Sequence, residues 1–391
     1  MKKSLTVVVA LLAFAILISC GDTTEPVVEK AAAKDEYFVY IGTYTKGESE
    51  GIYAYRFDAA SGQLSSLGAA AKLREPSFLA IHPNSRFLYA VSEIDDFDAD
   101  KNGSVSGFEI DSESGGLTPM NTVSSKGAWP CHLNVDQTGK TLAVANYRSG
   151  TVATISLDAD GKFGSGGAAI QNSGSSVHPR QQSPHAHSVA FSPDNRYLIS
   201  ADLGTDQVDV YRVDAERAAL KANDPAFAKV NPGSGPWHFA FHPNSKYGYV
   251  INEIQSTVTA FDWDSEQGSL TEIQTISTLP EDFTGESTTA EIAVHPSGKF
   301  LYGSNRGHDS IAVFAIDESS GKLTATERTS TQGKKPRSFS IDPTGQFLFV
   351  VNQDTNSLVL FRIEQQTGRL TKEGEALEVP SPVCVKFVKA G

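Results

Sequence analysis

The stretch "FHPNSKYGYVINE", at positions 241–253, decides the fold because closely similar stretches recur along the chain. Two of them are "IHPNSRFLYAVSE" at 81–93 and "VHPSGKFLYGSNR" at 294–306. Each stretch combines a His-Pro turn, a mostly apolar segment and a polar final residue. Internal repeats with a period of about 20–50 residues are typical of solenoids, propellers and repeat arrays. The spacing of these copies is therefore the first evidence on the fold.

Six copies of the turn occur between positions 83 and 343. Their central residues are Pro83, Gln137, Pro193, Pro243, Pro296 and Pro343. Neighbouring copies are spaced by about 50 residues, within the range of known repeat architectures. Alternation of apolar residues with a period of two predicts one strand before the turn and two after it, and a "GxLT"-like segment predicts a fourth. Four antiparallel strands per roughly 50 residues are the pattern of a propeller blade.

The two ends of the chain supply a seventh blade. The segments 37–47 and 51–68 resemble strands two to four of a blade that lacks its first strand. The segment "SPVCVKFV", at 381–388, resembles a first strand with nothing after it. Joining them would close the ring and hide the strand edges, which otherwise invite aggregation. The sequence predicts an all-β, seven-bladed β-propeller with four antiparallel strands per blade, closed by its N- and C-terminal strands. One short stretch, 214–224, is a candidate helix.

The N-terminus has the pattern of an export signal. Lys2 and Lys3 precede the apolar run 5–17, and "LISC" follows it at 17–20. This pattern resembles the bacterial lipobox, so we expect a signal peptide at 1–19, lipidation of Cys20, a flexible tether to position 36 and a propeller domain at 37–391. A plain signal peptide or an anchor helix is the alternative. The expected protein is an exported bacterial lipoprotein of the periplasm or cell envelope, attached to the membrane by its lipid alone. Gly21 follows the lipidated cysteine in place of the aspartate that signals retention at the inner membrane, which favours the outer membrane.

Charge and cysteine content exclude some classes of partner. The chain has a net charge of −13, which becomes −15 when Lys2 and Lys3 leave with the signal peptide. Nucleic-acid binding requires basic patches, so this balance argues against it, and it argues against docking of the folded body on anionic lipid. Cys131 and Cys384 are too few for a disulfide framework, so we expect two buried thiols, with a single bridge as the alternative.

Two sets of equivalent positions are predicted to meet at one rim of the central channel, because the first two strands of a blade form a hairpin around the turn. The post-turn set follows the second strand and consists of Glu93, Tyr147, Leu203, Glu253, Arg306 and Gln353. The pre-turn set begins the first strand and consists of Ser77, Cys131, His187, Trp237, Ala290 and Arg337. These side chains differ from blade to blade, as expected for a functional site. A simply solvated polar rim is the alternative.

Glu253, Arg306 and His187 are the candidate catalytic residues on this rim. A carboxylate beside an arginine and a histidine suits general-base catalysis with a bound anion or oxyanion. The candidate substrate-binding residues are His185, Trp237, His238, Glu291, Arg337 and Glu93. The sequence contains no G-x-S-x-G elbow and no H-E-x-x-H zinc motif.

We expect no metal and no cofactor. His185 and His187, in "PHAH", would face one side of a strand, but two histidines alone do not make a metal site. The segment 98–109, "DADKNGSVSGFE", matches the calcium-loop pattern through Asp98, Asp100, Asn102, Gly103 and Glu109. The predicted context is two strands rather than two helices, so bound calcium is kept as an alternative only.

The motifs "YIGTYT", "PHAHSV", "INEIQSTVTAFDW", "STTAEI", "SNRGHDSI" and "SPVCVKF" resemble the seven-bladed β-propeller lactonase family over roughly residues 37–389. This family includes propeller-type 6-phosphogluconolactonases and carboxy-cis,cis-muconate lactonising enzymes. The resemblance implies site roles for His187 (or His185), Glu253 and Arg306. It also implies an arginine in a "GPRH" stretch, where this chain has "GPWH" and therefore Trp237.

The resemblance implies a lactone hydrolase that acts on a small, sugar-derived lactone, with Glu253 activating the attacking water. Export and the missing arginine favour an unphosphorylated lactone. Two alternatives remain open: a muconate-type lactonising or cycloisomerase enzyme, and a non-enzymatic propeller that binds a glycan or a protein, for which Trp237 suits sugar stacking.

Overall fold

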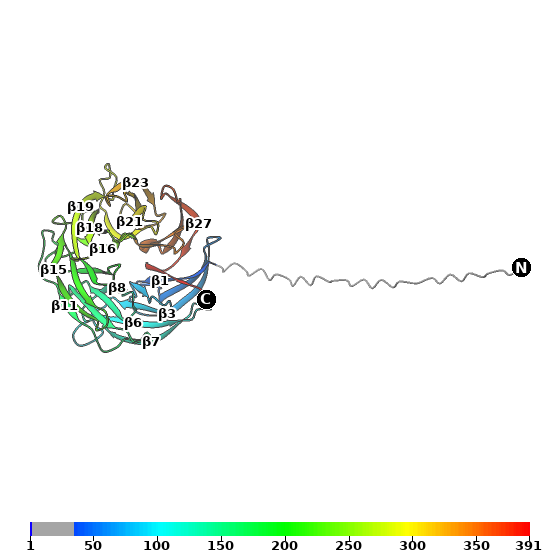
Figure 1. The fold of residues 1–391 in the computed structure, drawn as a ribbon, viewed down its shortest axis with the longest axis horizontal. Coiled ribbons are helices and arrows are strands. Elements are labelled where there is room, and N and C mark those ends of the chain that lie inside the picture. The colour runs from blue at the N-terminus through cyan, green and yellow to red at the C-terminus, as the bar shows by residue number, and fades with distance from the viewer. Residues whose placement is uncertain (2–34) are drawn as a thin grey trace. The chain divides into compact units, whose positions relative to one another are not determined.

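The computed structural model describes residue 1 and residues 35–391. Residues 35–391 form a ring of seven four-stranded antiparallel sheets (Figure 1). The expected signal peptide, Cys20 and the part of the expected tether before position 35 lie outside the described residues. Within the described part of the chain, no helix has the length and apolar character needed to span a membrane.

The predicted ring closure is confirmed. One sheet has the order β28 (Pro382–Lys389), β1 (Glu36–Thr43), β2 (Gly51–Asp58) and β3 (Gln63–Lys72). The C-terminal strand therefore lies innermost in the first blade and pairs antiparallel with β1 (Figure 1). The N-terminal and C-terminal strands of the propeller thus complete one sheet, so β1 does not present a free edge to the channel.

The remaining six blades each follow the chain in order, with the innermost strand first. Three of them consist of β4 (Leu79–Ile81), β5 (Phe87–Ser92), β6 (Ser104–Ile110), β7 (Leu117–Ser124); β8 (Pro130–Val135), β9 (Thr141–Asn146), β10 (Thr151–Ser156), β11 (Ala169–Gln171); and β12 (Ala186–Phe191), β13 (Tyr197–Asp202), β14 (Gln207–Asp214), β15 (Ala219–Lys229). The other three consist of β16 (Pro236–Phe241), β17 (Tyr247–Asn252), β18 (Thr257–Asp264), β19 (Ser269–Ser277); β20 (Thr288–Val294), β21 (Phe300–Arg306), β22 (Ser310–Ile316), β23 (Leu323–Ser330); and β24 (Pro336–Ile341), β25 (Phe347–Asn352), β26 (Ser357–Ile363), β27 (Leu370–Glu378).

The short helix considered at 214–224 is wrong. Asp214 ends β14 and pairs with Ala219, the first residue of β15, so this stretch is a hairpin. Its alanines and lysine favour a helix, but so short a segment cannot offset the cost of helix nucleation. The one helix among the described residues is a 3-10 turn, η1 (Gln353–Thr355).

Histidines of the His-Pro turns join neighbouring blades. In three blades the histidine Nε2 lies 2.8–3.0 Å from a glycine carbonyl in the equivalent turn of the next blade. The pairs are His82 with Gly139, His242 with Gly298, and His295 with Gly345. The repeated letters of the 241–253 stretch therefore hold the ring together as well as turning the chain.

Buried tyrosines form a second set of bonds between blades. Their hydroxyls donate to glycine carbonyls 2.8–3.0 Å away in the outer turn of the next blade. The pairs are Tyr40 with Gly115, Tyr89 with Gly161, Tyr249 with Gly321, and Tyr302 with Gly368. All four glycines have φ between 69° and 80°, which residues with a Cβ rarely adopt.

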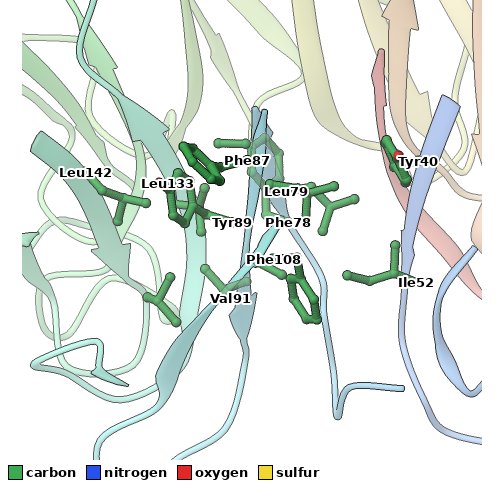
Figure 2. Packing of buried hydrophobic residues seen from close by; sticks show 14 of the residues in the cluster. Tyr40, Ile52, Phe78, Leu79, Phe87, Tyr89, Val91, Phe108, Leu133 and Leu142 are labelled. Carbon is green, nitrogen blue, oxygen red and sulfur yellow. The ribbon is translucent and has the colours of Figure 1, made fainter. Parts of the chain in front are cut away.

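The hydrophobic core lies between adjacent sheets. Figure 2 shows one cluster, in which Tyr40 and Ile52 of the first blade approach Phe78, Tyr89 and further residues of the blades that follow. Cys131 and Cys384 are buried and unpaired, as expected, so the disulfide alternative is wrong.

Candidate active site

Glu253 is fixed at the rim where the second strand of its blade ends. It directly follows β17, and its amide donates to the carbonyl of Gly235, 2.7 Å away. Its own carbonyl accepts from the amide of Thr289 in the next blade. The backbone therefore holds Glu253 between two blades, with its side chain 5% exposed.

Each carboxylate oxygen of Glu253 accepts a hydrogen bond from a different arginine. Nη2 of Arg306 donates to Oε1 at 2.8 Å, and Nη2 of Arg180 donates to Oε2 at 2.7 Å. Arg306 also donates to the carbonyl of Thr289 at 2.6 Å. Burial lowers the pKa of Arg306 to about 10, and the neighbouring Glu253 limits that fall. Both guanidinium groups nevertheless remain charged at neutral pH.

Arg180 was not among the residues that the sequence pointed to. It lies in the connection 172–185 between β11 and β12, which we call the strap. Arg180 also donates to the hydroxyl of Tyr147, a member of the post-turn set, at 3.3 Å. One signal in the sequence pointed to this segment. The spacing between the second and third turns, Gln137 and Pro193, is the longest in the repeat, and the additional residues lie just before the "PHAH" motif.

His187 and Trp237 stack on each other inside the rim. Their ring centroids are 3.2 Å apart, and the guanidinium groups of Arg306 and Arg337 lie 4.6 Å and 5.3 Å from the Trp237 ring. Trp237 is only 4% exposed, so it does not offer an open face for sugar stacking as the sequence suggested. It lies on β16, the innermost strand of its blade, which directs it into the channel.

His187 is neutral at physiological pH. Burial lowers its pKa well below the ordinary value, and nearby His238 and Arg337 add to the effect. Nδ1 of His187 and Nε of Arg306 are buried and lack a hydrogen-bond partner among the described residues. Two buried polar atoms that flank Trp237 are therefore not satisfied by described protein groups, and each is a position where a water molecule could bind.

His238 and Glu291 contact each other deeper in the channel. Nδ1 of His238 lies 2.7 Å from Oε1 of Glu291, and Ser338 donates to Oε2 at 3.0 Å. Burial raises the pKa of Glu291, but His238, the charge of Lys386 and the Ser338 hydrogen bond together outweigh it, and the net pKa is lowered. The ring of His132 lies 4.9 Å from that of His238. Glu291 is therefore already committed to partners within the channel.

Glu93, Arg337 and His185, the other predicted residues, each contact a tyrosine. Tyr44 donates to Glu93 at 2.9 Å, and the Arg337 guanidinium lies 5.4 Å from the Tyr44 ring. Burial raises the pKa of Glu93. The ring of His185 stacks on Tyr147, with centroids 4.6 Å apart.

His185 and His187 lie on either side of a local irregularity in the strand. His185 directly precedes β12, and the register shifts between Ala186 and Ser188. Both imidazoles still contact Tyr147, since the ring of His187 lies 5.6 Å from it. The shift separates their roles: His187 enters the channel, whereas His185 stays at the rim.

The channel below the rim is nearly filled. Its cavity has a volume of about 10 Å³, roughly enough for one water molecule. The lining residues are Ser77, Phe78, Cys131, His187, Trp237, His238, Arg337 and Val383. Most of them belong to the pre-turn set, as the hairpin geometry predicts. A lactone ring cannot enter this cavity, so it would bind on the rim beside Glu253.

The residues of the calcium-loop pattern at 98–109 do not converge on one point. Asp98 accepts hydrogen bonds from Asp100 and Asn102 within a tight turn. Glu109 lies near the far end of β6, roughly 20 Å away at about 3.3 Å per residue, and pairs with Arg86. Among residues 35–391, no group of three or more acidic, histidine or cysteine side chains is arranged to hold a metal ion. The calcium alternative is therefore wrong for this arrangement of the loop.

Comparison with known proteins identifies relatives that are similar to this chain in sequence and in structure. The model of the family described as "Lactonase, 7-bladed beta-propeller" matches residues 38–387. A 6-phosphogluconolactonase of Bacillus subtilis is 41% identical over 353 residues, covering 90% of this chain and 99% of that protein. A 6-phosphogluconolactonase of Formosa agariphila is 37% identical over 309 residues, covering 78% of this chain and 86% of that protein. The solved structure of a periplasmic gluconolactonase of Pseudomonas aeruginosa superposes with a TM-score of 0.83 at 36% identity, covering 91% of this chain and all of that one.

Proposed function

Because this chain belongs to the seven-bladed β-propeller lactonase family, we propose that it hydrolyses a lactone derived from a sugar. Relatives that share about 40% of its sequence carry the name 6-phosphogluconolactonase. The observation that carries the proposal is the Glu253 carboxylate, held at the channel rim between the guanidinium groups of Arg306 and Arg180. This arrangement combines a proton acceptor with groups that bind negative charge, which are the two requirements for opening a lactone with water.

In the proposed mechanism, Glu253 takes a proton from water as the water oxygen attacks the ring carbonyl. The carbonyl oxygen then carries the negative charge of a tetrahedral intermediate. Arg306 stabilises this charge, because its bond to the Thr289 carbonyl holds its guanidinium in place before the reaction. His187 lies inside the channel behind the rim, where its neutral imidazole stacks on Trp237 and so holds that ring against the Arg306 guanidinium. When the ring C–O bond breaks, protonated Glu253 returns its proton to the leaving oxygen, and the product is a hydroxy acid.

We also propose that the protein is exported and anchored by lipid on Cys20. The N-terminal pattern supports this, and the relative from Pseudomonas aeruginosa is described as periplasmic. Metabolic labelling with a palmitate analogue should mark the wild-type protein and leave Cys20→Ser unmarked. Equal labelling of both proteins would contradict lipidation at Cys20.

Glu253→Gln tests the proposed mechanism, because it keeps the size of the side chain and removes its ability to accept a proton. We expect kcat for lactone hydrolysis to fall by about 10²–10⁴-fold, the usual contribution of a general base. The assay should cover several sugar lactones and identify the product, since a hydroxy acid indicates hydrolysis and a ring isomer indicates a cycloisomerase. Glu109→Gln, which removes an exposed carboxylate paired with Arg86, is the matched control. Full activity of Glu253→Gln above spontaneous ring opening would exclude Glu253 as the base.

A further inference from the structure

Arg180 and Arg306 hold the same carboxylate, but the protein holds the two arginines very differently. The Arg306 side chain is 8% exposed and has the Thr289 carbonyl as a second partner. The Arg180 side chain is 42% exposed, and its other partner is the Tyr147 hydroxyl at the long distance of 3.3 Å. The Arg180 side chain therefore reaches solvent from its end of the pair, so an incoming anion can approach it and compete with Glu253. Arg306 lies in a buried network and cannot exchange its partners in this way.

The backbone that carries Arg180 is nevertheless well fixed. Its neighbour Gln181 is fully buried and donates to the Leu203 carbonyl and to Asp206. Asp206 also accepts from Ser176 in the same strap at 2.5 Å. Arg180 can therefore change its partner by rotation of its long side chain alone, while its backbone stays beside Glu253.

Oε2 of Glu253 must be free to accept a proton from water, yet the Arg180 guanidinium occupies it in this structure. The charged and titratable groups that face Glu253 are Arg180 from the strap, Arg306 from β21, Arg337 from β24 and the Tyr147 phenol. If Arg180 leaves, Arg306 still holds Oε1, so the carboxylate keeps its position and orientation. Arg337 is covered by Tyr44 and Trp237, which leaves Arg180 as the accessible cation of this group.

We infer that Arg180 is a substrate-binding residue that leaves Glu253 when the lactone binds and pairs with a negatively charged group carried outside the lactone ring. This inference rests on the proposed hydrolysis and gives it a charged substrate, a lactone that bears a phosphate or a carboxylate. It departs from the unphosphorylated lactone that the missing family arginine favoured, because Arg180 supplies an accessible cation beside Glu253. Binding of such a substrate would uncover Oε2 for the attacking water. A neutral lactone offers the guanidinium no partner of comparable strength, because charge-assisted hydrogen bonds are about twice as strong as neutral ones.

The test compares three lactones in one assay: gluconolactone as the neutral lactone, 6-phosphogluconolactone with a phosphate, and muconolactone with a carboxylate. Arg180→Gln should raise KM for the charged lactones by about 10- to 100-fold and for gluconolactone by less than about 3-fold. The two charged lactones separate phosphate from carboxylate as the recognised group. Arg180→Lys should retain much of the affinity for phosphate and less for carboxylate, because lysine binds as a point charge without the planar fork.

Arg148→Gln is the matched control. Arg148 is another exposed arginine, and it donates to Asp95 at 2.7 Å without contacting Glu253. It should leave all KM values within about 2-fold of wild type, as expected for a surface ion pair. Equal changes of KM for charged and neutral lactones in Arg180→Gln, or no change, would overturn the inference.

Calorimetric binding of 6-phosphogluconate distinguishes failure of this inference from failure of the proposed function. It needs no turnover, so it applies even if the wild-type protein hydrolyses none of the lactones. We expect wild type and Glu253→Gln to bind 6-phosphogluconate more tightly than gluconate, and Arg180→Gln to lose at least about 10-fold in affinity. If wild type and Arg180→Gln bind 6-phosphogluconate with equal affinity, the proposed role of Arg180 is refuted, whatever the hydrolysis assay shows.

Discussion

At the scale of single residues, the channel interior depends on histidines that stay uncharged. Burial lowers the pKa of His132 and places that of His187 well below its ordinary value. A buried charge without a partner is costly, and these imidazoles lie close to the cations Arg306, Arg337 and Lys386. Protonation of either imidazole would add positive charge to a region that already holds it.

This arrangement predicts that acid destabilises the fold in a defined pH window. Below the unfolded-state value of 6.5, the unfolded chain binds protons at His132 and His187 that the folded protein does not, so stability falls as pH falls. Each histidine contributes a slope of about 1.4 kcal/mol per pH unit in this window. Glu291 adds a second loss at more acidic pH, below its ordinary value of 4.5, because its folded-state pKa is lowered.

Thermal unfolding between pH 7.5 and pH 5 measures the effect, with a fall in midpoint expected from about pH 6.5 downwards. His132→Gln should reduce the slope, because one of the two titrating groups is then absent. A midpoint that stays constant from pH 7 to pH 5.5 would show that these imidazoles are protonated without cost.

At the scale of elements, one aspartate ties the strap to the body of the propeller. Asp206 accepts from Ser176 and Gln181 in the strap and from the amides of Gly233 and Gly235, at 2.5–2.8 Å. It is 4% exposed. The same carboxylate therefore orders the strap, which carries Arg180, and the loop that leads into Trp237.

Asp206→Asn should loosen both segments. The substitution exchanges one acceptor oxygen for an NH2 group that faces donors, and its cost should be about 3 kcal/mol, since bonds to a buried charged group are worth about 1.5–3 kcal/mol each and do not add fully. Asp206 has φ of 54°, a conformation that asparagine tolerates, so backbone strain does not complicate the result. Hydrogen exchange in the strap, 172–185, should become faster.

Asp214→Asn provides the comparison for this experiment. Asp214 pairs with Arg217 on the surface, and its loss should change stability by less than about 0.5 kcal/mol. If Asp206→Asn is as mild as Asp214→Asn, the strap is held by other contacts.

At the scale of the whole molecule, the described propeller depends on bonds that run from blade to blade. Histidines of the inner turns and tyrosines of the second strands each reach a glycine carbonyl in the next blade. A ring built in this way has no end blade, provided that β28 completes the first sheet.

Removal of the segment 382–391 should therefore prevent a stable fold. It deletes the innermost strand β28, exposes the edge of β1 and removes the buried Val383, Cys384 and Val385 from the core. We expect aggregation by size-exclusion chromatography and loss of the cooperative unfolding transition. Removal of positions 390–391 alone, which lie beyond β28, should leave the fold intact. A monomeric, cooperatively folded form of the longer truncation would contradict closure by β28.

Local patterns in the sequence were sufficient for the architecture of the described propeller, 35–391. Alternation with a period of two, the His-Pro turns and the "GxLT" segments act over short distances along the chain, and their repetition predicted the strand order of every blade. The closing strand could be predicted because the N-terminal part of the propeller lacks the first strand of a blade and the C-terminal end has one such strand left over, so the two must form one blade. The stretch 214–224 misled because helix propensity is a weak preference that hairpin pairing overrides.

The sequence by itself determined the ring and the placement of Glu253, Arg306 and His187 near one another, because equivalent positions of a repeat return to equivalent places. Only the tertiary structure decided that Arg180 contacts Glu253, that Trp237 is buried and that Glu291 pairs with His238. The physical reason is that these contacts join residues from different blades or from an insertion outside the repeat. Their partners depend on the path of the strap and on packing within a narrow channel, which no local periodicity encodes.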